Sequence, residues 1–111
     1  MKWFRTSEFI QFSKMQPALL EKLDKARDIA GIPFHITSSY RSPEYNSIVG
    51  GVANSAHVRG YAVDIRCLDS ESRFKIVYGA FCAGFPRIGI GKNFVHLDCD
   101  PSLPSPCIWL Y

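Results

Sequence analysis

The sequence predicts an α+β domain in which helices pack on an antiparallel sheet. Segments with helical spacing come mostly early in the chain, and two strands joined by a short turn come late. The chain has 111 residues, of which 47% are hydrophobic and 14% aromatic. These apolar side chains suffice for one hydrophobic core, and the chain is too short to form two. We therefore expect residues 1–111 to form a single domain.

The first predicted helix covers residues 17–30. Pro17 suits its first turn, and Gly31 suits the position after its last residue. Residues 34–37 then form a short predicted strand. Capping residues and terminal glycines predict a helix from Pro43 to Gly50, capped by Ser42, and a later helix from Asp69 or Ser70 to Gly84. A polar loop over 52–59 and a strand with alternating residues over 61–66 lie between these two helices. Paired strands over 87–91 and 94–98 follow, and the tail from residue 100 is expected to be irregular until 108–110.

The last of these helices carries its large apolar residues on one side. Phe74, Val77, Tyr78 and Phe81 follow the spacing of an amphipathic helix. The pattern therefore predicts one apolar and one polar face for this helix.

Charge and hydropathy exclude several classes of protein. The 13 Lys and Arg against 10 Asp and Glu leave a net charge of +3, which is too small to indicate a nucleic-acid partner. The sequence has no apolar run long enough to predict a membrane span. Arg5 and Glu8 lie where a secretory signal would need its apolar stretch. We therefore expect synthesis in the cytoplasm without a signal peptide, and we expect a monomer.

The four cysteines are Cys67, Cys82, Cys99 and Cys107, and none of them forms a C-x-x-C pair. A zinc ribbon or a thioredoxin-type site therefore has no support. In a protein made in the cytoplasm these residues are expected as reduced thiols. The alternative is a disulfide between Cys99 and Cys107 that pins the proline-rich tail.

Asp64 is the most unusual position in the strand patterns, because it interrupts a segment suited to a sheet interior. A carboxylate there would cost several kcal/mol unless it were paired or bound to a metal. His96 lies in a second apolar strand, and His57 lies in a loop of small residues, whereas His35 is expected to be structural. Two imidazoles and one carboxylate are the ligand set of a catalytic zinc site. Spacing alone leaves a second interpretation open, in which Asp64 pairs with Arg66 or with a histidine.

Three motifs resemble one family of enzymes. Residues 55–64 read SAHVRGYAVD and resemble the S-x-H-x-x-G-x-A-x-D signature of the zinc D-alanyl-D-alanine carboxypeptidases. Residues 38–46 (SSYRSPEYN) are similar to that family's S-x-Y-R-S-x-x-x-N segment, and residues 89–98 (GIGKNFVHLD) are similar to its G-x-G…F-V-H-x-D strand. The family also contains phage L-alanyl-D-glutamate endopeptidases and is related in fold to the hedgehog signalling domain. With Trp109, which is similar to a tryptophan near the end of the short members, the resemblance covers about residues 34–109.

The resemblance implies a role for each matching residue. His57, Asp64 and His96 would be the zinc ligands. Arg41 would meet a substrate carboxylate or the developing oxyanion, and the guanidinium fork suits both. The other interpretation of Arg41 is a surface arginine after a strand. Ser55 would bind substrate or make a hydrogen bond within its own loop.

The chain departs from the longer family members at Asn93. Those members carry Glu or Asp three residues before the last histidine, where it serves as general base, and an amide cannot take that role. Short members share the H-x-D ending, which Asp98 supplies here. Residues two apart in a strand point to the same face, so Asp98 should lie beside His96. It would act as the catalytic base or would orient the ligand histidine, and an uninvolved Asp98 is the remaining alternative.

The resemblance thus implies a zinc metallopeptidase, a hydrolase that degrades the cell wall. Its substrate would be a peptidoglycan stem peptide cut at an alanine-containing amide bond, as in a carboxypeptidase or a phage endolysin. The expected cofactor is zinc, and the expected site of action is the cell wall, reached by a phage lysis route. The alternative, motivated by Asn93, is an inactive or weakly active zinc-containing module that binds the wall or a protein.

Overall fold

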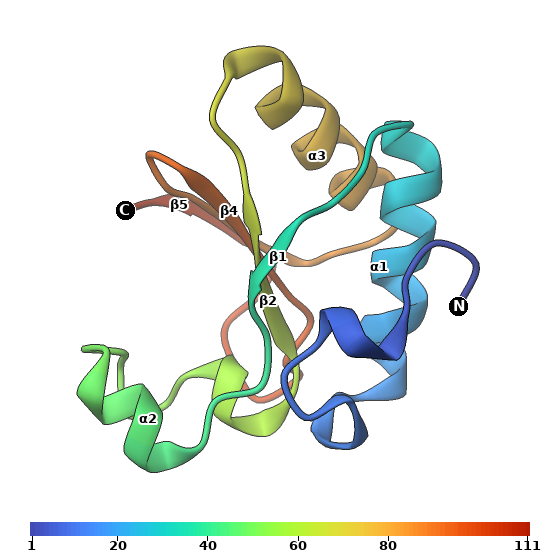
Figure 1. The fold of residues 1–111 in the computed structure, drawn as a ribbon. Coiled ribbons are helices and arrows are strands. Elements are labelled where there is room, and N and C mark those ends of the chain that lie inside the picture. Colours follow the sequence, from blue (N-terminus) through green and yellow to red (C-terminus); the bar gives the residue numbers. More distant parts are fainter.

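A five-stranded sheet separates two long helices on one face from a short helix on the other (Figure 1). The computed structural model describes residues 1–111. The strands are β1 (Ile36–Ser38), β2 (Ala62–Arg66), β3 (Arg87–Ile90), β4 (Phe94–Asp98) and β5 (Cys107–Leu110), in the order β1-β2-β4-β3-β5. All neighbouring strands are antiparallel except β3 and β5, which are parallel. The predicted α+β class is confirmed, and the parallel pair at one edge is an addition to it.

Helices α1 (Pro17–Ala30) and α3 (Ser70–Cys82) cover one face of this sheet (Figure 1). The opposite side carries α2 (Pro43–Ile48) and the 3-10 turn η3 (Ala56–Arg59), and two further 3-10 turns, η1 (Thr6–Glu8) and η2 (Phe12–Lys14), precede α1. The predicted caps form, since the hydroxyl of Ser42 accepts from the backbone N–H of Tyr45. None of the helices is both long and apolar enough to cross a membrane.

Strand alternation sorts the side chains of β2 and β4 between the two faces. Val63, Ile65, Val95 and Leu97 belong to the core cluster that also contains the buried hydrophobic side chains of α1 and α3. The intervening residues face the other side, and the register aligns them in pairs across the two strands: Ala62 opposite Asp98, Asp64 opposite His96, and Arg66 opposite Phe94. The sheet therefore presents its polar side chains in successive rows on one face, which we call the site face.

Helix α3 does not pack on the core with its aromatic side. Phe74, Tyr78 and Phe81 are 72%, 53% and 75% exposed, and the buried residues are Ile76, Gly79 and Ala80. A Cβ atom at Gly79 would lie 2.4 Å from a backbone oxygen of α1, so the two helices approach too closely for a larger residue. Close helix packing thus selects the side with small residues, and the aromatic side faces solvent.

The tail after β4 returns to the sheet as β5, where Trp109 lies opposite Gly89 of β3. A Cβ atom at Gly89 would lie 2.7 Å from ring atoms of both Trp109 and Tyr111. The missing side chain at position 89 therefore lets these two rings lie over the sheet beside β4.

Gly89→Ala should displace these rings and destabilise the protein by about 1–3 kcal/mol, the usual cost of overpacking. Chemical denaturation of the wild type and the variant measures this change in the free energy of unfolding. The penalty should shrink in a Trp109→Ala background, because part of the clash is then absent. An unchanged unfolding free energy in Gly89→Ala would contradict the close approach.

Candidate metal centre

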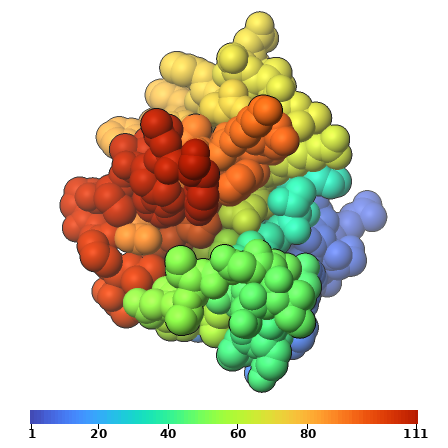
Figure 2. All heavy atoms as spheres, turned by 90° about the vertical axis from the view of Figure 1, so that its left-hand side faces the viewer, coloured from blue at the N-terminus to red at the C-terminus, as the bar shows by residue number.

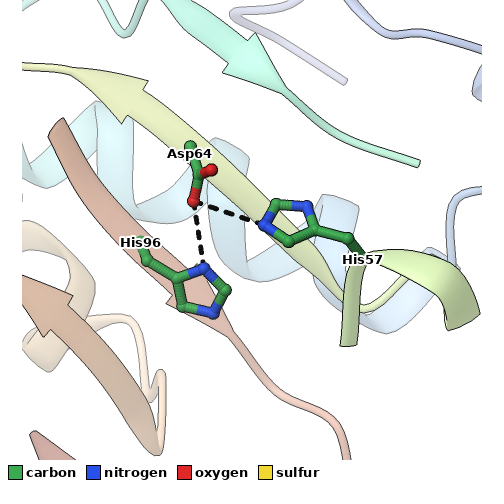
Figure 3. A group of neighbouring side chains, drawn as sticks. All are labelled: His57, Asp64 and His96. Atoms are coloured by element: carbon green, nitrogen blue, oxygen red, sulfur yellow. Dashed lines mark hydrogen bonds and ion pairs between the residues drawn. The ribbon is translucent and has the colours of Figure 1, made fainter. Parts of the chain in front are cut away.

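The three predicted ligand residues meet on the site face (Figure 3). His57 comes from η3, Asp64 from β2 and His96 from β4, and one ligand atom of each lies within 4.8 Å of the other two. All three residues are buried, with exposures of 3%, 9% and 6%. The structure therefore brings together residues that are separated by up to 39 positions in the chain, from His57 to His96.

Local structure explains why the motif around His57 has its particular residues. The hydroxyl of Ser55 accepts from the backbone N–H of His57 and begins η3. Gly60 ends η3 in the left-handed region at φ 76°, and a Cβ atom there would lie 2.1 Å from the carbonyl oxygen of Lys14. Glycine at this position lets the chain turn from η3 into β2, which carries Asp64.

Hydrogen bonds behind each imidazole orient the two histidines. His57 Nδ1 lies 2.8 Å from the carbonyl oxygen of Ser39, and this acceptor requires a proton on Nδ1. His96 Nε2 lies 2.7 Å from Asp98 Oδ2, which favours the proton on Nε2. In these neutral tautomers, unprotonated His57 Nε2 and His96 Nδ1 both face Asp64 Oδ1, at 3.3 Å and 3.0 Å.

This donor set fits a zinc ion. Two imidazole nitrogens and one carboxylate oxygen converge, and each imidazole has its other nitrogen held by an acceptor, as in three-ligand zinc sites. The three residues also border a cavity, which leaves room for a further ligand.

Charged and polar neighbours set the protonation of the cluster. Burial by itself raises the pKa of Asp64, but the imidazoles of His57 and His96, which donate to this carboxylate when they are protonated, outweigh burial and hold that pKa well below its usual range. Burial by itself lowers the pKa of His96, but the carboxylates of Asp64 and Asp98, which accept from the protonated ring, raise it. The carboxylate of Asp64 is therefore ionised over the whole physiological range, as a metal ligand requires.

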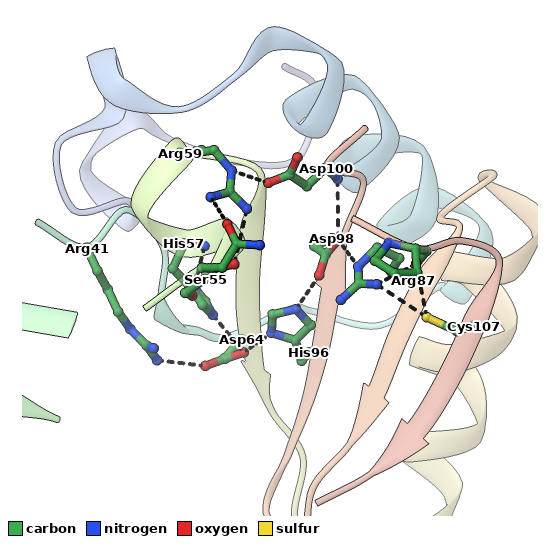
Figure 4. Close-up of polar contacts among 12 residues, drawn as sticks. Arg41, Ser55, His57, Arg59, Asp64, Arg87, His96, Asp98, Asp100 and Cys107 are labelled. Carbon is green, nitrogen blue, oxygen red and sulfur yellow. Dashed lines mark hydrogen bonds and ion pairs between the residues drawn. The ribbon is translucent and has the colours of Figure 1, made fainter. Parts of the chain in front are cut away.

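Arg41 lies on the outer side of Asp64 (Figure 4). Its guanidinium reaches Asp64 Oδ2 at 3.3 Å, Ser38 Oγ at 3.0 Å and Asn46 Oδ1 at 3.4 Å. The side chain is only 17% exposed and borders the same cavity. Arg41 is therefore held beside the cluster rather than free on the surface.

Asp98 lies on the far side of His96 from Asp64 (Figure 4). Its Oδ2 accepts from His96 Nε2, and its Oδ1 accepts from Arg87 Nε at 2.8 Å. The residue is 1% exposed. Both oxygens are thus engaged, and neither contacts the converging ligand atoms. This geometry favours the orienting role over the base role, of the alternatives that the sequence leaves open for Asp98.

Arg87 is a residue of the site that sequence reasoning missed. Besides its bond to Asp98, its guanidinium lies 4.9 Å from the ring centre of Trp109, a cation–π contact. The strand alternation of β3 contained the signal, because Arg87 and Gly89 share a face and Gly89 is part of the recognised motif.

Asp100 is a second functional residue that the sequence pattern does not reveal, since it lies in the segment predicted to be an irregular tail. The structure buries it at 2% exposure, where its carboxylate pairs with Arg59 of η3 and accepts from the hydroxyl of Ser102. Burial by itself would raise the pKa of Asp100, but the bonds from Ser102 and Arg59 lower it below 3.8. The contact ties the tail to η3, the turn that carries His57.

Asp100→Asn should destabilise the protein by about 2 kcal/mol at neutral pH, the value of hydrogen bonds to a buried charge. Because the pKa of Asp100 is lower in the folded protein, its charge stabilises the fold above pH 3.8, and this contribution is lost as the pH falls through the folded pKa. Unfolding by urea at several pH values should therefore show a difference between variant and wild type at pH 7 that shrinks below pH 3.8. A difference that does not change with pH would contradict the ionic role.

The cluster opens into a cavity of about 540 Å³. Figure 2 shows the site face, with the C-terminal tail in red and the segment around α2 in green on either side of a hollow. Trp109 and Tyr111 form an aromatic wall, and the Trp109 ring lies 5.4 Å from the ring of His96. All six residues singled out from the sequence border this cavity, namely Arg41, Ser55, His57, Asp64, His96 and Asp98.

The cysteines take no part in the cluster. All four are free: Cys67 is buried, Cys99 is half-buried, and Cys82 and Cys107 are exposed. Burial raises the pKa of the Cys99 thiol to about 11.

In a comparison with family models, residues 3–98 match the family described as Peptidase M15. The matched part contains the three converging residues and Asp98, and it ends before β5. No curated protein matches the chain.

Proposed function

The chain belongs to the peptidase M15 family, and from this membership and its metal cluster we propose that it is a zinc peptidase that cuts stem peptides of peptidoglycan. Peptidases of this family are zinc-dependent and act on peptidoglycan peptides. The proposed bond is an alanine-containing amide, either between two terminal D-alanines or within the stem between L-alanine and D-glutamate.

One observation carries the proposal. His57 Nε2, Asp64 Oδ1 and His96 Nδ1 point at one another from three separate elements, and each imidazole is held from behind. These three atoms would hold the zinc. Zinc in such a site supplies Lewis-acid chemistry, which activates water and polarises a carbonyl group.

The residues around the cluster would bind and orient the substrate. Arg41 presents a guanidinium to the cavity while Ser38, Asn46 and Asp64 hold it in place. A fixed guanidinium suits a substrate carboxylate or the oxygen that gains charge as the amide is attacked. Trp109 and Tyr111 would exclude water from one side of the bond.

Asp98 would hold the proton of His96 rather than take one from water. The 2.7 Å contact keeps that proton on Nε2 and leaves Nδ1 with its lone pair directed at the cluster. Arg87 keeps the Asp98 carboxylate in place through Oδ1. We therefore assign Asp98 as a positioning residue of the site.

The test is to digest purified peptidoglycan with the zinc-loaded protein and to identify the products by mass spectrometry. New stem-peptide fragments are expected, and their masses report which amide bond was cut. A chelator should abolish product formation, and added zinc should restore it. The absence of any new fragment, with zinc bound at one ion per chain, would refute the peptidase.

A second candidate function follows from Asn93. Asn93 occupies the position at which the longer family members carry the Glu or Asp that serves as general base. It borders a second hollow, next to the cavity that the candidate ligands line. A zinc-containing module that binds the cell wall without cutting it would have such a site. Sedimentation of the protein with insoluble peptidoglycan, in the absence of any released fragment, would favour this candidate.

A further inference from the structure

The cavity beside the His57, Asp64 and His96 cluster, which we call the metal cavity, adjoins a second hollow on the site face. This hollow has a volume of about 590 Å³, and Arg41, Val49, Asp64 and Phe94 line both it and the metal cavity. The two hollows adjoin at these four residues, and we refer to them together as the groove beside the cluster. A peptide bound at the metal centre can therefore extend into the second hollow.

Arg66 stands in this second hollow, one row along the sheet from the cluster. Asp64 and Arg66 are two residues apart in β2 and project to the same face, opposite His96 and Phe94 of β4. Two residues of a strand span about 7 Å. An extended peptide that follows the groove would cover this distance with about two of its own residues.

The charges in the second hollow favour an anion. It is lined by two arginines and by the polar side chains of Thr37, Ser38 and Asn93, and its one carboxylate is that of Asp64. Asp64 is already engaged by Arg41 and by both histidines. Arg66, by contrast, forms no ion pair with any acidic side chain of the protein.

The position of Arg66 in the sheet is also unusual. The other residues of β2 are buried, whereas Arg66 is exposed at the end of the strand. Phe94 and Leu68 line the hollow beside it and leave its guanidinium open to a ligand. A guanidinium forms charge-assisted and often bidentate hydrogen bonds with a carboxylate.

We propose that Arg66 binds a carboxylate of the substrate about two residues from the amide bond that is cut. Arg66 is thus a specificity-determining residue, and the protein selects acidic peptides. This inference rests on the proposed peptidase function, because it assumes that a peptide binds at the metal centre. The carboxylate is supplied by the C-terminus of the peptide or by a carboxyl branch within it.

The test uses one stem-type peptide in three forms: the acid, the form amidated at its C-terminus, and the form amidated at its branch carboxyl. We expect the kcat/KM of the wild type to be about 10-fold higher for the acid than for the form that lacks the bound carboxylate. This difference should arise from a higher KM for the amidated form, with kcat unchanged. Arg66→Gln should lower this ratio to near 1, and Arg66→Lys should retain part of it. Arg5→Gln, an exposed arginine outside both hollows, is the matched control and should leave the ratio unchanged.

A binding measurement separates this inference from the proposed function. Calorimetric titration of the three peptides into chelator-treated protein needs no turnover, and the same order of affinities is expected there. A protein that binds the acid preferentially through Arg66 but cuts nothing would refute the peptidase and leave the carboxylate site intact. Equal affinity for all three forms, a preference that Arg66→Gln retains, or no binding of any form would overturn the carboxylate site.

Discussion

Asp64→Asn is expected to lower the zinc affinity of the protein by more than 100-fold and to reduce hydrolysis to the level of the chelated enzyme. Asp64 supplies the one anionic oxygen among three converging ligand atoms, so its replacement removes charge from the centre of the cluster. Changes at residues that merely support a ligand cost about 10–100-fold in metal affinity, and loss of a ligand should cost more. Zinc content after dialysis against a competing chelator, with peptide cleavage alongside it, measures both effects.

Asp28→Asn is the matched control for this substitution. Asp28 is an exposed carboxylate of α1 that pairs with Lys2, far from the cavity walls. It makes the same chemical change and should leave zinc content and rate unchanged. Full zinc binding together with full activity in Asp64→Asn would show that the cluster is a structural group of polar residues, the alternative that spacing alone leaves open.

Asp98→Asn has the second largest expected effect, and it distinguishes the two roles of Asp98. As a positioning residue, Asp98 fixes His96 Nδ1 toward the cluster, so the variant should bind zinc about 10–100-fold more weakly. Excess zinc should then restore much of the rate. A general base would behave differently, since zinc binding would persist while the rate fell by about 100-fold or more.

Titration of activity against free zinc therefore decides between the roles of Asp98. Arg87→Gln offers a supporting measurement, because it removes a partner of Asp98 without touching His96. A smaller loss of zinc affinity is expected there than in Asp98→Asn. A rate that stays low in Asp98→Asn at saturating zinc would contradict the positioning role and would indicate that Asp98 acts as the general base.

The convergence of His57, Asp64 and His96 was predictable in part, because the family resemblance singled out these three residues and local rules place them. Alternation puts Asp64 and His96 on one face of their strands, and the serine and glycine of the η3 motif explain how His57 reaches them. The antiparallel pairing of β3 and β4 was predictable for the same reason, since a short turn joins the two strands.

The remainder of the site depends on contacts between distant segments. The pairing of β5 with β3 follows a proline-containing connection whose path has no local signal. Asp100 looked like a loop residue because its partner, Arg59, lies 41 positions earlier. The buried side of α3 was also unpredictable from its own pattern, because the small residues that α1 requires outweigh the large apolar ones.

The hydrogen bonds behind the two imidazoles also bear on how the proposed zinc ion would bind. Ser39 O and Asp98 hold the rings of His57 and His96 through contacts that do not involve a metal. The loss of rotamer freedom in these side chains therefore occurs when the chain folds, and little of it remains for the moment of binding. Zinc should accordingly enter a preorganised site, and its affinity should appear as added stability of a fold that exists without it, rising with free zinc as mass action requires.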